Sequence, residues 1–175
     1  MAVEQAILQF EDKKFSNDTL SFVFEAGQAA ILEHQLHVGN KDSMKTTMTA
    51  LFMDEKNIQW GHIGDSRIYY FKNKRLVSKT MDHSVPQMLA AAGEIQESQI
   101  RLHPDRNRLL RVMGTEWNGT PYQIGDSIAR RGEQAFLLCS DGLSNMVRDE
   151  EIHEIIYSAH DIEEAAKQLV EKANE

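Results

Sequence analysis

The sequence predicts an α+β fold with antiparallel sheets, and the order of the expected elements carries this prediction. A long amphipathic helix comes first, closely spaced strands and one short helix fill the middle, and two helices close the chain. Strands joined by short turns pair in antiparallel fashion, because a parallel pair needs a long crossover. Runs of strands followed by helices are typical of the α+β class.

The first helix is expected from about Thr19 to His37, where apolar residues recur three and four positions apart. Asn17 or Asp18 is placed to cap its first turn. The preceding stretch, Met1 to Phe15, fits either a short helix or a strand, and the sequence leaves both open.

The predicted strands are short runs of apolar and β-branched residues bounded by polar turns. Asp54 to Asn57 and Lys72-Asn73-Lys74 are typical of such turns, and neighbouring runs are expected to pair with one another. The strands are expected over residues 46–53, 58–63, 68–71, 76–78, 120–128 and 135–139.

The remaining helices are expected around this strand region. Val85 to Ala92 is predicted to be helical and to stop at Gly93, and residues 94–107 form a polar loop with one short helix. Two closing helices, 149–157 and 161–173, each begin at an acidic residue that suits the helix dipole. No repeat or linker divides the chain, so residues 1–175 are interpreted as one domain.

The amino-acid composition limits the kinds of partner that we expect for this chain. The chain of 175 residues carries a net charge of −8, which repels phosphates, so we expect no nucleic-acid partner. No apolar run is long enough to span a bilayer, so no membrane association is expected. The start of the chain lacks a signal peptide and Cys139 is the single cysteine, which together predict a cytoplasmic protein.

Two motifs place a carboxylate directly after a predicted strand. They are Gly64-Asp65-Ser66-Arg67 and Ser140-Asp141-Gly142. Hard cations such as Mg²⁺ and Mn²⁺ prefer oxygen ligands, and two aspartates at adjacent strand ends can share one ion. The alternative for each motif alone is a common turn, in which the carboxylate accepts a hydrogen bond from its own backbone.

Other polar residues are given simpler interpretations. The histidines show no zinc-binding spacing and are expected on the surface or in capping roles, and Cys139 is expected to be a small buried side chain. Ser66 and Ser140 lack an adjacent base. A basic cluster has two interpretations, a salt-bridged surface or a landing surface for phosphorylated protein; it comprises Arg101, Arg106, Arg108 and Arg111.

Five segments, taken together and in order, resemble the bacterial type 2C (PPM-type) metal-dependent Ser/Thr protein phosphatases. Lys45 stands where the family's Gly-Thr-Thr strand start has glycine. The segments are Met44 to Thr47; Ile58 to Phe71, which is similar to the family's central hairpin; Met81-Asp82-His83-Ser84 with Ala92 to Ile95; Asn107 to Gly114; and Phe136 to Leu143.

This resemblance implies a partial four-layer α-β-β-α sandwich and hydrolysis of phosphoserine and phosphothreonine esters in a phosphorylated protein substrate. The family uses a water molecule held by two Mn²⁺ or Mg²⁺ ions. Asp141 resembles the aspartate that ligates one ion of this pair. Asp65 resembles the aspartate that, with Asp141, holds the third metal of bacterial members.

The sequence departs from the family pattern at both ends. We find no counterpart of the opening Arg-x-x-Asn-Glu-Asp region, of the Asp-Gly-x-Gly-Gly motif or of the closing Asp-Asn motif. We therefore expect an incomplete metal site and little hydrolysis by this chain alone; the alternative function is an inactive phosphatase-like binding or regulatory module. Exposed sheet edges are expected to favour a homo-oligomer.

Overall fold

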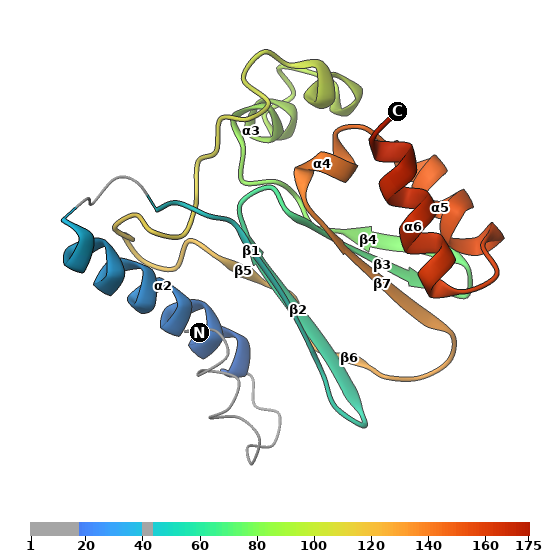
Figure 1. The fold of residues 1–175 in the computed structure, drawn as a ribbon, viewed down its shortest axis with the longest axis horizontal. Helices are drawn as coiled ribbons and strands as arrows, with labels where there is room; N and C mark the ends of the chain where they lie inside the picture. The colour runs from blue at the N-terminus through green and yellow to red at the C-terminus, as the bar shows by residue number, and fades with distance from the viewer. Residues whose placement is uncertain (1–17, 40–43) are drawn as a thin grey trace.

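The computed structural model describes residues 18–39 and 44–175, and in it two antiparallel sheets lie between two layers of helices (Figure 1). Helix α2 covers one sheet, and helices α5 and α6 cover the other. This is the expected α+β class and the four-layer arrangement. The stretch from Met1 to Phe15, left open by the sequence, lies outside the described residues.

Helix α2 (Thr19–Val38) follows the predicted boundaries closely. Asp18 occupies the N-cap position, as expected of one of the two candidates, but its side chain makes no capping hydrogen bond; Asn17 lies outside the described residues. The helix ends at Gly39, whose φ of +70° lies in the left-handed region that favours glycine.

The first sheet is built around β2 (Asn57–Ile63), which pairs with β1 (Met48–Met53) through the predicted turn. The Asp54 carboxylate holds this turn by accepting hydrogen bonds from the backbone N–H groups of Lys56 and Asn57, at 2.7 and 2.6 Å. The other side of β2 pairs with two very short strands, β5 (Gln123–Ile124) and β6 (Ile128–Ala129).

The prediction of one continuous strand over residues 120–128 is therefore wrong. Gly61 pairs with Ile124, whereas Ile58 pairs with Ile128. Between these pairs β2 advances three residues and its partner advances four, so one extra residue bulges out and breaks the ladder. The Gln59 side chain compensates in part for the interrupted ladder, because its amide nitrogen donates a hydrogen bond to the carbonyl of Gly125 at 3.0 Å.

The second sheet has the order β4-β3-β7, comprising β3 (Arg67–Lys72), β4 (Arg75–Lys79) and β7 (Gln134–Cys139). Asn73 and Lys74 form the predicted hairpin turn with φ of +48° and +58°. Two successive residues of positive φ give the twist that a tight antiparallel hairpin requires.

Strands β2 and β3 lie in different sheets, so the expected pairing of these neighbours is wrong and residues 58–71 form a crossover instead of a hairpin. The chain leaves the first sheet at Gly64, where φ is +101°. A Cβ atom at Gly64 would lie 2.2 Å from Cγ2 of Thr47, so only glycine fits this turn.

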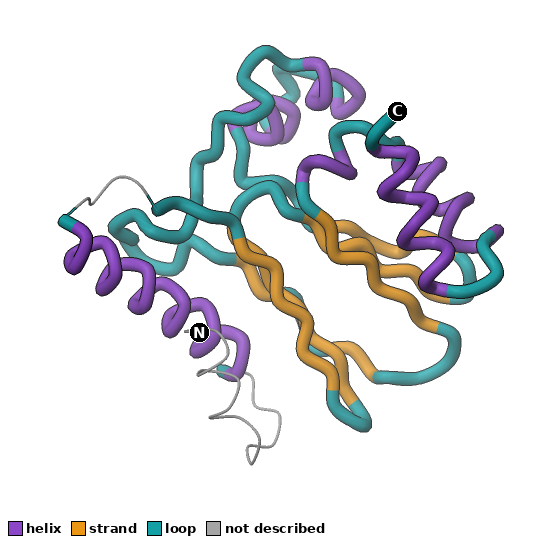
Figure 2. The backbone as a smooth tube through the Cα atoms, in the orientation of Figure 1, coloured by secondary structure: helices purple, strands orange, loops and turns teal. Residues whose placement is uncertain are grey.

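The helices around the sheets largely follow prediction, as the tube view in Figure 2 shows. They are α3 (Val85–Ala91), the 3₁₀ helix η1 (Glu97–Leu102), α5 (Asp149–Ser158) and α6 (Ile162–Ala173). The additional helix α4 (Asp141–Ser144) was not predicted, because a single turn is too short to show helical periodicity. Within the described ranges, no helix has the length and apolar character needed to cross a membrane.

Each sheet has its own core on its helix-covered face. Phe24 of α2 is fully buried against Ile63 and Met113, and Tyr69 and Phe71 of β3 pack against the closing helices. The space between the sheets holds an aromatic group in which the rings of Trp60, Tyr70 and Phe136 lie 4.9–5.5 Å apart. Burying one such large side chain contributes about 2–3 kcal/mol to folding.

Candidate metal centre

Asp65 and Asp141 lie at the same end of two adjacent strands. Strands β3 and β7 run antiparallel, and Arg67 pairs with Cys139. Asp65 comes two residues before Arg67, and Asp141 comes two residues after Cys139 as the first residue of α4. The register therefore brings Asp65 and Asp141 to one sheet end, as expected.

The electrostatics of Asp65 reflect this proximity. Burial raises its pKa above the ordinary value, and the negative charge of Asp141 raises it further. A hydrogen bond from the backbone of Asp65 itself lowers the pKa, as in the turn that the sequence left open as the alternative. Asp82 adds a smaller upward contribution, and the guanidinium of Arg67 adds a smaller downward one. A carboxylate whose ionisation is disfavoured by a neighbouring negative charge is stabilised by a cation placed beside it.

Asp82 forms an ion pair with Arg67. Both oxygens of its carboxylate accept hydrogen bonds from the guanidinium, Oδ1 from Nε and Oδ2 from Nη2, at 2.7 Å each. The two side chains are only 9% and 8% exposed. This bidentate pair fixes the start of β3 next to Asp65 and removes Asp82 from the set of free carboxylates.

Two buried histidines brace the turn that carries Asp65, which corrects the expected surface role of His62 and His83. The N–H of Gly64 donates to Nδ1 of His83 at 3.2 Å, and the N–H of His83 donates to the carbonyl of Gly64 at 2.9 Å. The rings of His62 and His83 stack at 4.5 Å. Burial, and then the neighbouring His62, lower the pKa of His83 to about 4, so its ring is neutral at pH 7.

The segment that resembles the family's strand start also contacts this turn. Thr46 exchanges two backbone hydrogen bonds with Met113, and the Thr47 hydroxyl lies 2.7 Å from the Ser66 hydroxyl. Ser66 is thus engaged with a neutral partner that cannot act as a base. The Thr47 side chain therefore packs against the Gly64 turn and contacts Ser66 at its end.

The other candidate residues take structural roles. Burial raises the pKa of Cys139 to about 11, so its thiol stays protonated, as expected of a buried side chain. Two of the four arginines of the basic cluster contact backbone carbonyls. Arg101 donates to the carbonyl of Asn145 and Arg111 to that of Pro121, and the two line different cavities.

Carboxylate oxygens are ligands that fit Mn²⁺ and Mg²⁺, and the structure offers two of them at this sheet end. Within residues 18–39 and 44–175, no group of three or more histidine, cysteine, aspartate or glutamate side chains is close enough to hold a metal ion. At this sheet end the described residues bring two carboxylates together, Asp65 and Asp141. Sequence motifs located both carboxylates, whereas the bracing roles of Asp82 and His83 depend on contacts that only the folded chain shows.

Comparison with curated proteins identifies relatives of known class. The serine/threonine phosphatase Stp of Listeria monocytogenes is 36% identical over 139 residues, which cover 76% of this chain and 52% of that protein. The serine/threonine protein phosphatase PstP of Mycobacterium tuberculosis is 30% identical over 174 residues, which cover 96% of this chain and 32% of that protein. The chain thus spans about half the length of Stp.

Solved structures give the same result for the fold. The Mycobacterium tuberculosis serine/threonine phosphatase PstP/Ppp superposes with a TM-score of 0.85 at 30% identity, covering 98% of this chain and 73% of that one. The catalytic domain of PstP in complex with two manganese ions superposes with a TM-score of 0.80 at 28% identity, covering 98% and 72%. The family model of protein phosphatase 2C matches residues 1–173, so the chain belongs to the protein phosphatase 2C family.

Proposed function

We propose that this chain forms part of a metal-dependent phosphatase that hydrolyses phosphoserine and phosphothreonine in protein substrates. The observation that carries the proposal is the placement of Asp65 and Asp141 at one sheet end, where the charge of Asp141 raises the pKa of Asp65. The names of Stp and PstP, both serine/threonine phosphatases, support this function over the inactive binding module.

In this proposal Asp65 and Asp141 hold Mn²⁺ or Mg²⁺ through their carboxylate oxygens. When bound, such an ion lowers the pKa of a coordinated water and offsets the charge of a phosphate. The protein's own contribution is rigidity. The Gly64 turn, the His83 brace and the Arg67–Asp82 pair hold the Asp65 backbone in place before any ligand arrives.

The ligand count sets the expected strength of binding. Two carboxylates leave most positions of a six-coordinate ion to water or to other ligands. We therefore expect weak Mn²⁺ binding and little hydrolysis of a phosphopeptide by residues 1–175 alone.

The proposal is tested by titrating the purified chain with Mn²⁺, using calorimetry and the electron paramagnetic resonance signal of free Mn²⁺. Asp65→Asn and Asp141→Asn should each weaken binding by about tenfold or more, since each removes a charged ligand. Asp126→Asn, the same change at an exposed residue between β5 and β6, should leave binding unchanged. Equal affinity in all four proteins would contradict the assignment of the ligands.

Activity is measured on a phosphothreonine peptide with added Mn²⁺. Slow turnover that Asp141→Asn abolishes supports the proposed function. Robust turnover that survives both substitutions would show that the reaction takes place elsewhere on the chain.

A further inference from the structure

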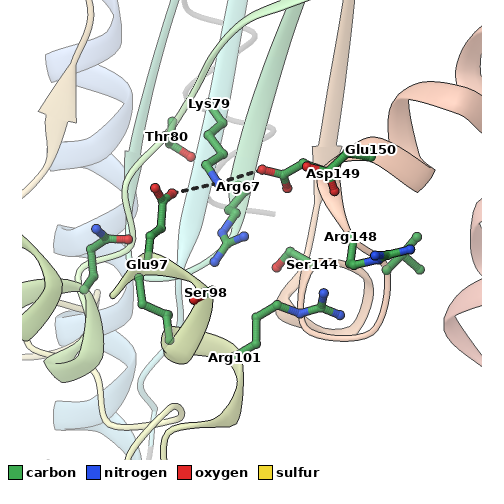
Figure 3. Close-up of a pocket in the computed structure, with 13 residues that line it drawn as sticks. Arg67, Lys79, Thr80, Glu97, Ser98, Arg101, Ser144, Arg148, Asp149 and Glu150 are labelled. Carbon is green, nitrogen blue, oxygen red and sulfur yellow. Dashed lines mark hydrogen bonds and ion pairs between the residues drawn. The ribbon is translucent and has the colours of Figure 1, made fainter. Parts of the chain in front are cut away.

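A second polar centre lies away from the two aspartates and joins three elements through Lys79. Its ammonium lies at the end of β4, 2.7 Å from Oδ2 of Asp149 at the start of α5 and 3.1 Å from Oε1 of Glu97 in η1. Figure 3 shows Lys79 between the two carboxylates, with dashed lines to both. One cation thus bridges two segments that are far apart in the sequence.

The two halves of this bridge differ in strength. Lys79 and Asp149 are 28% and 25% exposed, and Asp149 also accepts a hydrogen bond from the buried hydroxyl of Tyr69 at 3.0 Å. Glu97 is 69% exposed, so water and salt screen its contact with Lys79. We therefore expect the Lys79–Asp149 contact to stay closed, and the Lys79–Glu97 contact to open without disturbing the hydrophobic core.

Lys79 stays charged in this setting. Burial of the ammonium lowers its pKa, but the hydrogen bond and charge of Asp149, with a smaller contribution from Glu97, raise it above the ordinary value. The contact with Glu97 is therefore an ion pair at any pH at which Glu97 is ionised. It responds to ionic strength more than to pH near neutrality.

Helix η1 packs against α3 and has few other attachments to the rest of the chain. Ile100 is its buried apolar residue, and Arg101 donates to the carbonyl of Asn145 at 2.8 and 3.2 Å. Leu102 is 85% exposed. Because η1 buries little apolar surface, each polar contact contributes a large fraction of the free energy that keeps η1 in place.

A cavity of about 470 Å³ lies between η1 and the body, as Figure 3 shows. Glu97, Ser98 and Arg101 come from η1, while Ser144 and Asp149 line the other side. Ser144 belongs to α4, the helix that begins at Asp141. The position of η1 therefore sets the width of this cavity.

We propose that Lys79 is a positioning residue, a salt-sensitive clasp that holds η1 against the start of α5 and so fixes the outer wall of this cavity. When salt opens the Lys79–Glu97 contact, η1 loosens while β3, β4 and α5 stay in place. This inference does not depend on the proposed phosphatase function, and its test requires no activity.

The test is hydrogen exchange of the amides in η1, where Gln99 and His103 donate backbone hydrogen bonds at 2.9 and 3.2 Å. In the unmodified chain, raising NaCl from about 0.05 M to about 0.5 M should speed their exchange about two- to fivefold, because salt screens exposed ion pairs. Lys79→Met should exchange fast at both concentrations. Lys79→Arg should restore slow, salt-sensitive exchange.

Two further variants separate the clasp from general destabilisation. Lys167→Met removes the same charge from an exposed pair with Glu171 on α6 and should leave η1 exchange unchanged. Glu97→Gln breaks only the outer contact and should abolish the salt response while β3 amides stay protected. Unchanged η1 exchange in Glu97→Gln would overturn the inference, even if Lys79→Met failed to fold. Faster exchange spread evenly over the chain in Glu97→Gln would overturn it as well.

Discussion

Asp82→Asn tests the buried ion pair that supports the candidate metal centre. The Arg67 guanidinium is bound by both oxygens of Asp82 at 2.7 Å, and the two side chains are 8% and 9% exposed. Asparagine keeps one acceptor oxygen and loses the charge, so one charge-assisted hydrogen bond disappears and the other weakens. The hydroxyl of Tyr69 already accepts a long hydrogen bond from Nη1 at 3.4 Å and is uncharged, so it does not replace the lost bond.

The expected loss follows from these contacts. A hydrogen bond to a charged group contributes about 1.5–3 kcal/mol, and breaking one partner of a buried ion pair costs about 3–5 kcal/mol. Because asparagine retains one acceptor, we expect the free energy of unfolding to fall by about 3 kcal/mol. Urea unfolding followed by the fluorescence of Trp60 and Trp117 measures this difference.

Two comparisons make the result decisive. Arg148→Gln removes the exposed pair with Glu151, whose side chains are 65% and 31% exposed, and should destabilise the protein much less than Asp82→Asn, because solvent screens this pair. Arg67→Met combined with Asp82→Leu removes both charges and should be more stable than Asp82→Asn, because no buried charge is left unpaired. A loss below about 1 kcal/mol in Asp82→Asn, or a less stable double variant, would refute the reasoning.

Three further predictions concern the turn and the sheet edges. His83 has a pKa of about 4 in the folded chain against 6.5 in the unfolded chain, so the unfolded state binds the proton first as pH falls. The free energy of unfolding should therefore drop by up to about 3 kcal/mol between pH 7 and 4. His83→Gln should flatten this part of the plot of unfolding free energy against pH. Gly64→Ala should cost more than about 2 kcal/mol in chemical unfolding, whereas Gly93→Ala, with φ of +76° but open space, should cost about 1 kcal/mol. Among the described strands β1 pairs on one side only, so light scattering should show concentration-dependent association that Met53→Lys reduces; a monomer at every concentration would contradict this.

Sequence prediction succeeded where the signal was local. Helix α2 was predicted because its apolar spacing repeats over several turns, and the hairpin after β3 because Asn73 tolerates positive φ. Asp161, predicted as the acidic residue that opens the last helix, is the N-cap of α6 and accepts a hydrogen bond from the N–H of Glu164 at 2.9 Å. Each of these depends on residues within a few positions of one another.

The errors came from contacts between distant residues. The crossover at Gly64 depends on Thr47, and the bulge between β5 and β6 depends on the register against β2. Neither partner is visible in a window of sequence, so a closely spaced pair of strands was predicted to form a hairpin. The distances that decide the outcome belong to the packing of two sheets, which periodicity does not encode.

The same distinction applies to the candidate site. Strand-end motifs predicted where Asp65 and Asp141 lie, because β3 and β7 are strongly apolar and their ends are easy to locate. Sequence did not reveal that Asp82 is committed to Arg67 or that His83 braces Gly64, since these contacts join residues 15 and 19 positions apart. Motif matches located those residues without giving their roles.

The balance of charge at this sheet end gives a physical reason for a cation there. Asp65 is influenced by the charges of Asp141, Asp82 and Arg67, and the bidentate pair makes Asp82 and Arg67 compensate each other. Asp65 and Asp141 then remain, and in the described part of the chain neither forms an ion pair with a basic side chain. A partly buried carboxylate next to another must either take up a proton or share a positive ion. The raised pKa of Asp65 corresponds to the first outcome, in which the carboxylate takes up a proton. A divalent cation provides the second outcome and leaves both carboxylates charged. The Arg67–Asp82 pair makes this choice necessary, because it occupies the nearest guanidinium that could otherwise have neutralised Asp65.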